Sequence, residues 1–73
     1  MNKQRRERIN EALARIGEAK DILEEVRDEE QEAYDNLPEG LQMAERGEQM
    51  QENVDQLDEI IGYLEEADEL SEL

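Results

Sequence analysis

The stretch that decides the fold is DNLPEG, residues 35–40, in a chain of 73 residues. Pro38 is the only proline; it lacks a backbone N–H and disfavours helix at the residue before it. Asn36 and Gly40 add residues that favour turns. Because regular apolar spacing continues on both sides of this stretch, it predicts a break between two helices.

Apolar residues before the break recur in steps of three and four, which is the spacing of one helix face. Written as heptads they form two columns, and the smaller residues of the second column would let a neighbouring helix approach closely. We expect a helix over about residues 3–35 and a turn over about residues 36–41. The first column is Ile9, Ile16, Leu23 and Leu37, and the second is Ala12, Ala19, Val26 and Ala33.

A second apolar seam follows the break and predicts a helix over about residues 42–71. Gly47 is its weak point, because glycine inside a helix costs up to about 1 kcal/mol relative to alanine. Two long helices with a short connection pack as an antiparallel hairpin. We therefore expect an all-α fold, a coiled-coil-like two-helix hairpin that forms one domain over residues 1–73. The seam residues are Met43, Met50, Val54, Leu57, Ile61 and Leu64.

Charged residues beside the two seams agree with antiparallel pairing. Folding the chain back at about residue 39 would bring Lys20 near Asp58 and Arg6 near Glu72. The basic N-terminus would then lie beside the acidic C-terminus.

Further apolar residues lie off the first seam. A wide core stripe with some exposed leucine would explain them, since soluble proteins tolerate it. We favour self-association, because a chain of about 70 residues rarely gains more than about 3–5 kcal/mol from a single core. The predicted assembly is a dimeric four-helix bundle. Tyr34 would cap the core near the turn, and the predicted self-association residues are Leu13, Ile22, Ile60, Ala67 and Leu70.

Negative charge dominates the composition. The chain has 23 acidic and 8 basic residues, a net charge of −15, and after residue 27 the only basic residue is Arg46. Such a surface repels nucleic acid and anionic lipid but attracts a basic protein. Disorder would also fit this composition, but the apolar spacing is too regular for an unstructured tail. We expect a basic host protein as partner and no direct contact with nucleic acid or membrane.

Residues for catalysis and metal binding are scarce. The chain has no His, Cys or Thr, and its only serine is Ser71, so we predict that it is not an enzyme and needs no cofactor. Residues 35–46 begin like a calcium loop, but Leu37 and Arg46 stand where oxygen ligands are required, so no metal site is predicted. No apolar run is long enough to cross a bilayer, which favours a cytoplasmic protein.

A row of carboxylates along the second helix is the most informative feature. Solvent-facing positions are normally charged, but lysines usually alternate with the glutamates, whereas like-charge pairs such as Glu48 with Glu52 are unfavourable. Tyr63 is the aromatic residue best placed to anchor a partner. With Tyr63, the predicted partner-binding residues are the members of this acidic row: Glu45, Glu48, Glu52, Asp55, Glu59, Glu66 and Glu69.

The segments RDEEQEAYDNLPEGLQ (27–42) and ERGEQMQENVDQLDEIIGYLEEA (45–67) resemble short uncharacterised acidic helical proteins of bacteriophages, prophages and bacterial mobile elements. The similarity covers most of residues 5–68 and implies a phage or mobile-element setting in a bacterial host cell. By analogy with small acidic proteins from that setting, the first hypothesis is an inhibitor that mimics nucleic acid and blocks a host nucleic-acid-binding or defence protein. The alternative is a structural or assembly hairpin that binds a partner helix through its apolar stripes.

Overall fold

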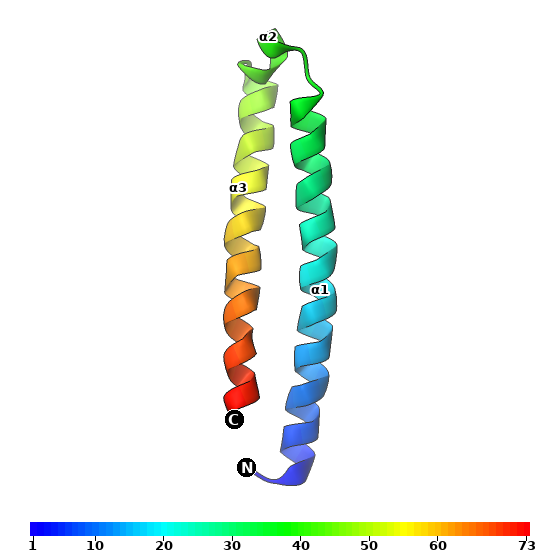
Figure 1. Ribbon diagram of the computed structural model, residues 1–73. Helices are drawn as coiled ribbons and strands as arrows, with labels where there is room; N and C mark the ends of the chain where they lie inside the picture. The colour runs from blue at the N-terminus through cyan, green and yellow to red at the C-terminus, as the bar shows by residue number, and fades with distance from the viewer.

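The computed structural model describes all residues from 1 to 73 and contains only helices. Helix α1 spans Lys3–Asp35, the short helix α2 spans Glu39–Gln42, α3 spans Glu45–Glu66, and the 3-10 helix η1 spans Ala67–Glu72. The predicted all-α class is confirmed. Figure 1 shows α1 and α3 running side by side in opposite directions, with α2 at the turn.

Helix α1 covers the range expected from the sequence, and both of its ends have hydrogen-bonding partners. The side chain of Asn2 accepts a hydrogen bond from the backbone N–H of Arg5 at 2.9 Å, an N-cap. At the other end, Gln42 Nε2 donates to the carbonyl oxygen of Tyr34 at 3.0 Å. A side chain from α2 thereby holds the end of α1.

The connection is longer than predicted, because α2 is inserted between the two long helices. The second helix was expected over about residues 42–71; its start is about three residues later, and helical structure continues to Glu72. It begins at Glu45, and its α-helical part ends at Glu66, after which η1 winds more tightly. Met43 was assigned to the second seam, but it lies between α2 and α3 and its side chain is 78% exposed.

Two contacts between the long helices define their register. Arg27 Nη1 lies 3.0 Å from Asp58 Oδ1, and Asn53 Nδ2 donates to Glu30 Oε2 at 2.9 Å. The predicted pairing of Asp58 with Lys20 is wrong by one heptad, because the longer connection moves the point of reversal along the chain.

The shifted register also leaves Arg6 and Glu72 without a salt bridge to each other. The N-terminal turns of α1 extend past the C-terminal end of the chain (Figure 1).

The face of α1 that packs on α3 differs from the predicted seam. Its first column is correct, but the second column is exposed. Leu13 and Tyr34 take its place, because these larger side chains remove more apolar surface from water than alanines do. Leu13, which was predicted to serve self-association, is half-buried and shares the helix face of Arg27. The half-buried residues of this face include Ile9, Leu13, Ile16, Lys20, Leu23, Arg27, Glu30, Tyr34 and Leu37.

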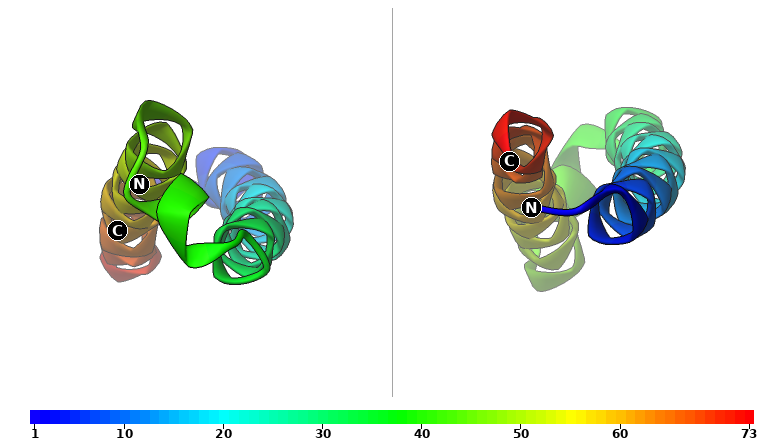
Figure 2. Two further views of the ribbon diagram at one scale, coloured as in Figure 1. Left: turned by 90° about the horizontal axis from the view of Figure 1, so that it is seen from above. Right: turned by 90° about the horizontal axis from the view of Figure 1, so that it is seen from below.

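The core is thin. Gly47, Val54 and Ile61 are the only buried residues, and of the large apolar side chains only Val54 at 6% and Ile61 at 3% exposure are buried. The molecule is a rod of 58 × 14 × 12 Å with a radius of gyration of 17.1 Å, against about 11 Å for a compact domain of this length. Seen along the rod, two helices lie beside each other with no further layer (Figure 2).

Candidate functional site

The acidic row lies on the outer surface of α3 and η1. Each of its seven members is exposed. The molecule has three salt bridges, formed by Arg15 with Glu11 and by Arg27 with Asp28 and Asp58, and none of them involves the row. The row is therefore negative charge that no basic side chain of the protein neutralises.

Tyr63 lies beside the row. Its hydroxyl donates a hydrogen bond to Glu59 Oε1 at 2.9 Å, and its ring is exposed. The bond joins neighbouring turns of α3 and orients the ring along the row. An exposed aromatic ring next to carboxylates can give a partner both apolar contact and a hydrogen-bonding group.

Arg27 connects the two helices on one side of the rod. Its guanidinium contacts Asp58 of α3 at 3.0 Å and Asp28 of α1 at 3.2 Å. The hydrogen bond to Asp58, and after it the hydrogen bond to Asp28, raises the pKa of Arg27 above its usual value. The arginine therefore stays charged while it holds carboxylates of both helices on the same side.

Asp28 belongs to a second set of carboxylates that sequence reasoning missed. Asp21 and Asp35 lie seven residues before and after it, so the three aspartates share one side of α1, and all are exposed. The contact of Arg27 with both Asp28 and Asp58 places this side of α1 next to α3. The seven-residue repeat of aspartate was the signal in the sequence that could have revealed it.

The second set raises the linear charge density. Two carboxylates per heptad, as in the acidic row, give about one charge per 5 Å of helix axis. A third per heptad from α1 gives about one per 3.5 Å, close to the roughly 3.4 Å spacing of phosphates along one strand of duplex DNA. Counted along the rod axis, the two sets together reach a carboxylate spacing comparable to that of the phosphates of one nucleic-acid strand, with Asp28 paired to Arg27.

The side of the rod away from the Arg27–Asp58 contact carries exposed apolar residues among polar ones. Glu30 and Asn53 contact each other there, Val26 lies one turn before Glu30, and Ile22 lies one turn further. On α3, Ile60 lies seven residues after Asn53 and shares its side. We call Ile22, Val26 and Ile60 the apolar face.

Two residues of the predicted self-association set, Ile22 and Ile60, therefore lie on one face, with exposures of 59% and 40%. Ala67 and Leu70, in η1, are half-buried.

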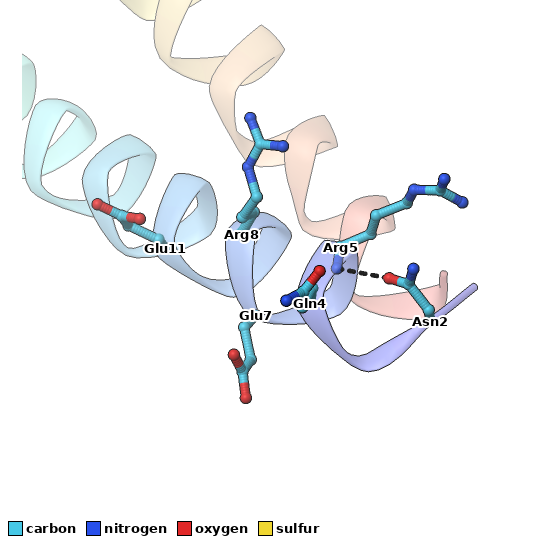
Figure 3. Close-up of a pocket in the computed structure, with 6 residues that line it drawn as sticks. All are labelled: Asn2, Gln4, Arg5, Glu7, Arg8 and Glu11. Carbon is cyan, nitrogen blue, oxygen red and sulfur yellow. Dashed lines mark hydrogen bonds between the residues drawn. The ribbon is translucent and has the colours of Figure 1, made fainter.

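Four of the eight basic residues, Lys3, Arg5, Arg6 and Arg8, lie at the N-terminal end of the rod. Figure 3 shows the six residues that line an open polar hollow at this end, Asn2, Gln4, Arg5, Glu7, Arg8 and Glu11. Arg5 and Arg8 also border a second hollow, which is lined on its apolar side by Met1, Ile9 and Ala12. Neither hollow holds a nucleophile with a neighbouring base, and both are shallow.

Other kinds of site have little support in the geometry. No group of three or more Asp, Glu, His or Cys side chains is arranged to hold a metal ion. None of the helices combines the length and apolar character needed to cross a membrane. No protein-family model, curated protein or solved structure matches this chain.

Proposed function

We propose that this protein is a non-catalytic acidic protein-binding module of a bacteriophage or other bacterial mobile element. It mimics nucleic acid and occupies the nucleic-acid-binding surface of a basic host protein, one that acts in defence. The observation that supports this most is the acidic row, which is exposed along its whole length and has no salt bridge. An ordinary exposed helix would carry lysines that stabilise it.

The acidic row and the aspartates of α1 would bind by charge complementarity. Carboxylates at a spacing near that of phosphates can replace phosphates in a groove lined by lysine and arginine. Association should be fast and strongly weakened by salt, because complementary potentials steer the encounter. Tyr63 would add an apolar contact at the edge of the row.

We also propose that the working unit is an antiparallel helical hairpin paired with a second copy in a four-helix assembly. A core with two buried large side chains gives one hairpin little stability. Pairing would bury more apolar surface, and it would present two acidic surfaces for each assembly.

The first step of the test is to identify the partner by affinity capture from bacterial lysate and mass spectrometry. The decisive measurement is then competition: bound protein should exclude DNA or RNA from the partner. Reversing Glu52, Asp55 and Glu59 to lysine should lower affinity for the partner by at least about 100-fold and restore nucleic-acid binding.

A matched control reverses Glu7, Glu11 and Glu18 to lysine. The change in net charge is identical, but these residues lie on α1, a different helix from the row. The control should keep most of its affinity. A partner that binds nucleic acid and this protein at the same time, with no loss of affinity for either, would overturn the proposal.

A second candidate function is supported by the apolar face. Three large apolar side chains exposed on one side of a rod would suit an assembly protein that binds a helix of another protein. In that case the charge would serve solubility, and the triple reversal of Glu52, Asp55 and Glu59 would leave partner binding intact.

A further inference from the structure

Carboxylates are absent from the side of α3 that carries Ile60. The five positions on this side, at 46, 49, 53, 56 and 60, hold Arg, Gln, Asn, Gln and Ile. Eight of the eleven other solvent-facing positions of α3 are Asp or Glu. These eight are Glu45, Glu48, Glu52, Asp55, Asp58, Glu59, Glu65 and Glu66.

The column of α1 that contains Val26 also lacks charged residues. Ala12, Ala19, Val26 and Ala33 follow one another at intervals of seven along α1, and all are exposed. Val26 is level with Asp58 in the observed register, within one turn of Ile60. The two helices together form a strip that is poor in charge, with Glu30 and Arg46 as its charged residues, on a chain whose net charge is −15.

The single chain exposes more surface than a compact monomer of the same mass. The accessible surface is 5770 Å², whereas a compact monomer of 8.6 kDa has about 4,700 Å². The excess of about 1,000 Å² is close to the roughly 800 Å² that each partner buries in a standard interface.

The position of the strip along the rod favours a symmetric partner. Residues 22–26 lie about 31 Å from the start of α1 at a 1.5 Å rise, close to the middle of the 58 Å rod. When a two-fold axis passes through the middle of the rod, two antiparallel copies lie side by side along their whole length. Such self-complementary pairing is the commonest form of homodimer.

The two ends of the rod complement each other as well. The N-terminal end has the hollow lined by Met1, Ile9 and Ala12, with Arg5 and Arg8 at its border. The turn end carries exposed Leu41 and Met43, with Glu39 and Glu45 close by in sequence. In an antiparallel pair each hollow meets the turn of the other copy, so apolar groups meet apolar groups and arginines meet glutamates.

We propose that a second copy of this chain docks on the apolar face in antiparallel orientation, with its turn at the N-terminal hollow. This inference rests on the paired assembly proposed above and is independent of the acidic partner. The arrangement buries Ile22, Val26 and Ile60 and leaves both acidic rows facing outward. It also keeps the two carboxylate-rich sides apart, where like charges would oppose pairing.

Single cysteines provide the test, because the protein contains none. Under mild oxidation Val26→Cys, near the proposed axis, should form disulfide-linked dimers efficiently. A mixture of Ala12→Cys and Met43→Cys should give the mixed dimer as the main product, with little of either homodimer. The control Asp55→Cys, on the acidic side, should form no disulfide-linked dimer, and circular dichroism confirms that each variant folds.

Sedimentation of the unmodified protein tests whether the chain pairs at all, and the cysteine variants test which face and orientation the pair uses. A folded monomer at all concentrations would overturn the pairing itself. If Asp55→Cys crosslinks and Val26→Cys does not, the proposed face is wrong. If Ala12→Cys forms homodimers efficiently, the two chains pair in parallel and the proposed antiparallel orientation is wrong. As a second measure, Ile22→Glu with Ile60→Glu should weaken dimerisation at least about 10-fold, and an unfolded double variant would leave the cysteine results to decide.

Discussion

Replacing Gly47 with alanine should destabilise the fold, although alanine is the better helix former. Gly47 is buried in the first turn of α3. A Cβ atom at this position would lie 2.6 Å from the carbonyl carbon and 2.7 Å from the Cα of Gln42. Side chains cannot approach backbone atoms so closely, so α2 would have to move away from α3.

The expected magnitude combines three contributions. Helix propensity favours alanine by about 1 kcal/mol. Forcing an extra carbon into a packed site costs about 1–3 kcal/mol. Moving α2 also disturbs the hydrogen bond from Gln42 to the carbonyl of Tyr34, which contributes about 1 kcal/mol. The net loss is about 1–3 kcal/mol, which lowers the melting temperature by about 5–20 °C in a domain of this size.

Thermal and urea unfolding followed by circular dichroism would measure this loss. Protein concentration must be held constant, because pairing makes the melting temperature depend on it. Gly17→Ala and Gly62→Ala are matched controls within helices, since a Cβ at either position has no atom within 4 Å, and each should stabilise by about 1 kcal/mol. A Gly47→Ala variant as stable as the unmodified protein would show that α2 does not pack against α3 as described.

Three further predictions concern charged side chains. Lys20→Leu should raise the free energy of unfolding, measured in urea, by about 1 kcal/mol. This half-buried lysine has no salt bridge and shares a helix face with Leu13, so a leucine would bury more apolar surface there. A lower free energy of unfolding would contradict the observed packing. Arg27→Met should lower the melting temperature by the same amount at about pH 7 and about pH 9. Because the pKa of Arg27 is raised in the folded protein, its ion pairs contribute their full stability below the usual arginine pKa, and this stability is lost only as the pH rises above that range. Added salt near neutral pH should raise the melting temperature by screening like charges, and no change would show that the acidic row is not strained.

Much of the architecture could be predicted because local rules agreed with each other. The steps of three and four before residue 35, the proline at residue 38 and the renewed spacing after it are sufficient for two helices and a break. The exposure of the acidic row was also predictable, since a continuous series of carboxylates at heptad intervals cannot be buried.

The sequence pattern did not decide which of two apolar columns of α1 faces α3. Ala12 and Leu13 are neighbours on the helix, and either column can form a seam. The larger side chains of Leu13 and Tyr34 decide the choice, because they remove more apolar surface from water than alanines do. The register depends on how many residues the connection uses, and the error in the Lys20 pairing follows from its extra length.

By itself, the sequence determined the helical class, the point of reversal to within a few residues and the concentration of negative charge after residue 27, because each depends on neighbours along the chain. Only the tertiary structure decided that Gly47 is required by the backbone of Gln42, that Asp28 and Asp58 share Arg27, and that the apolar and acidic residues occupy opposite sides of the rod. These features depend on contacts between residues more than four positions apart, or on the side of the helix pair to which each residue turns. Helical periodicity alone carries neither kind of information.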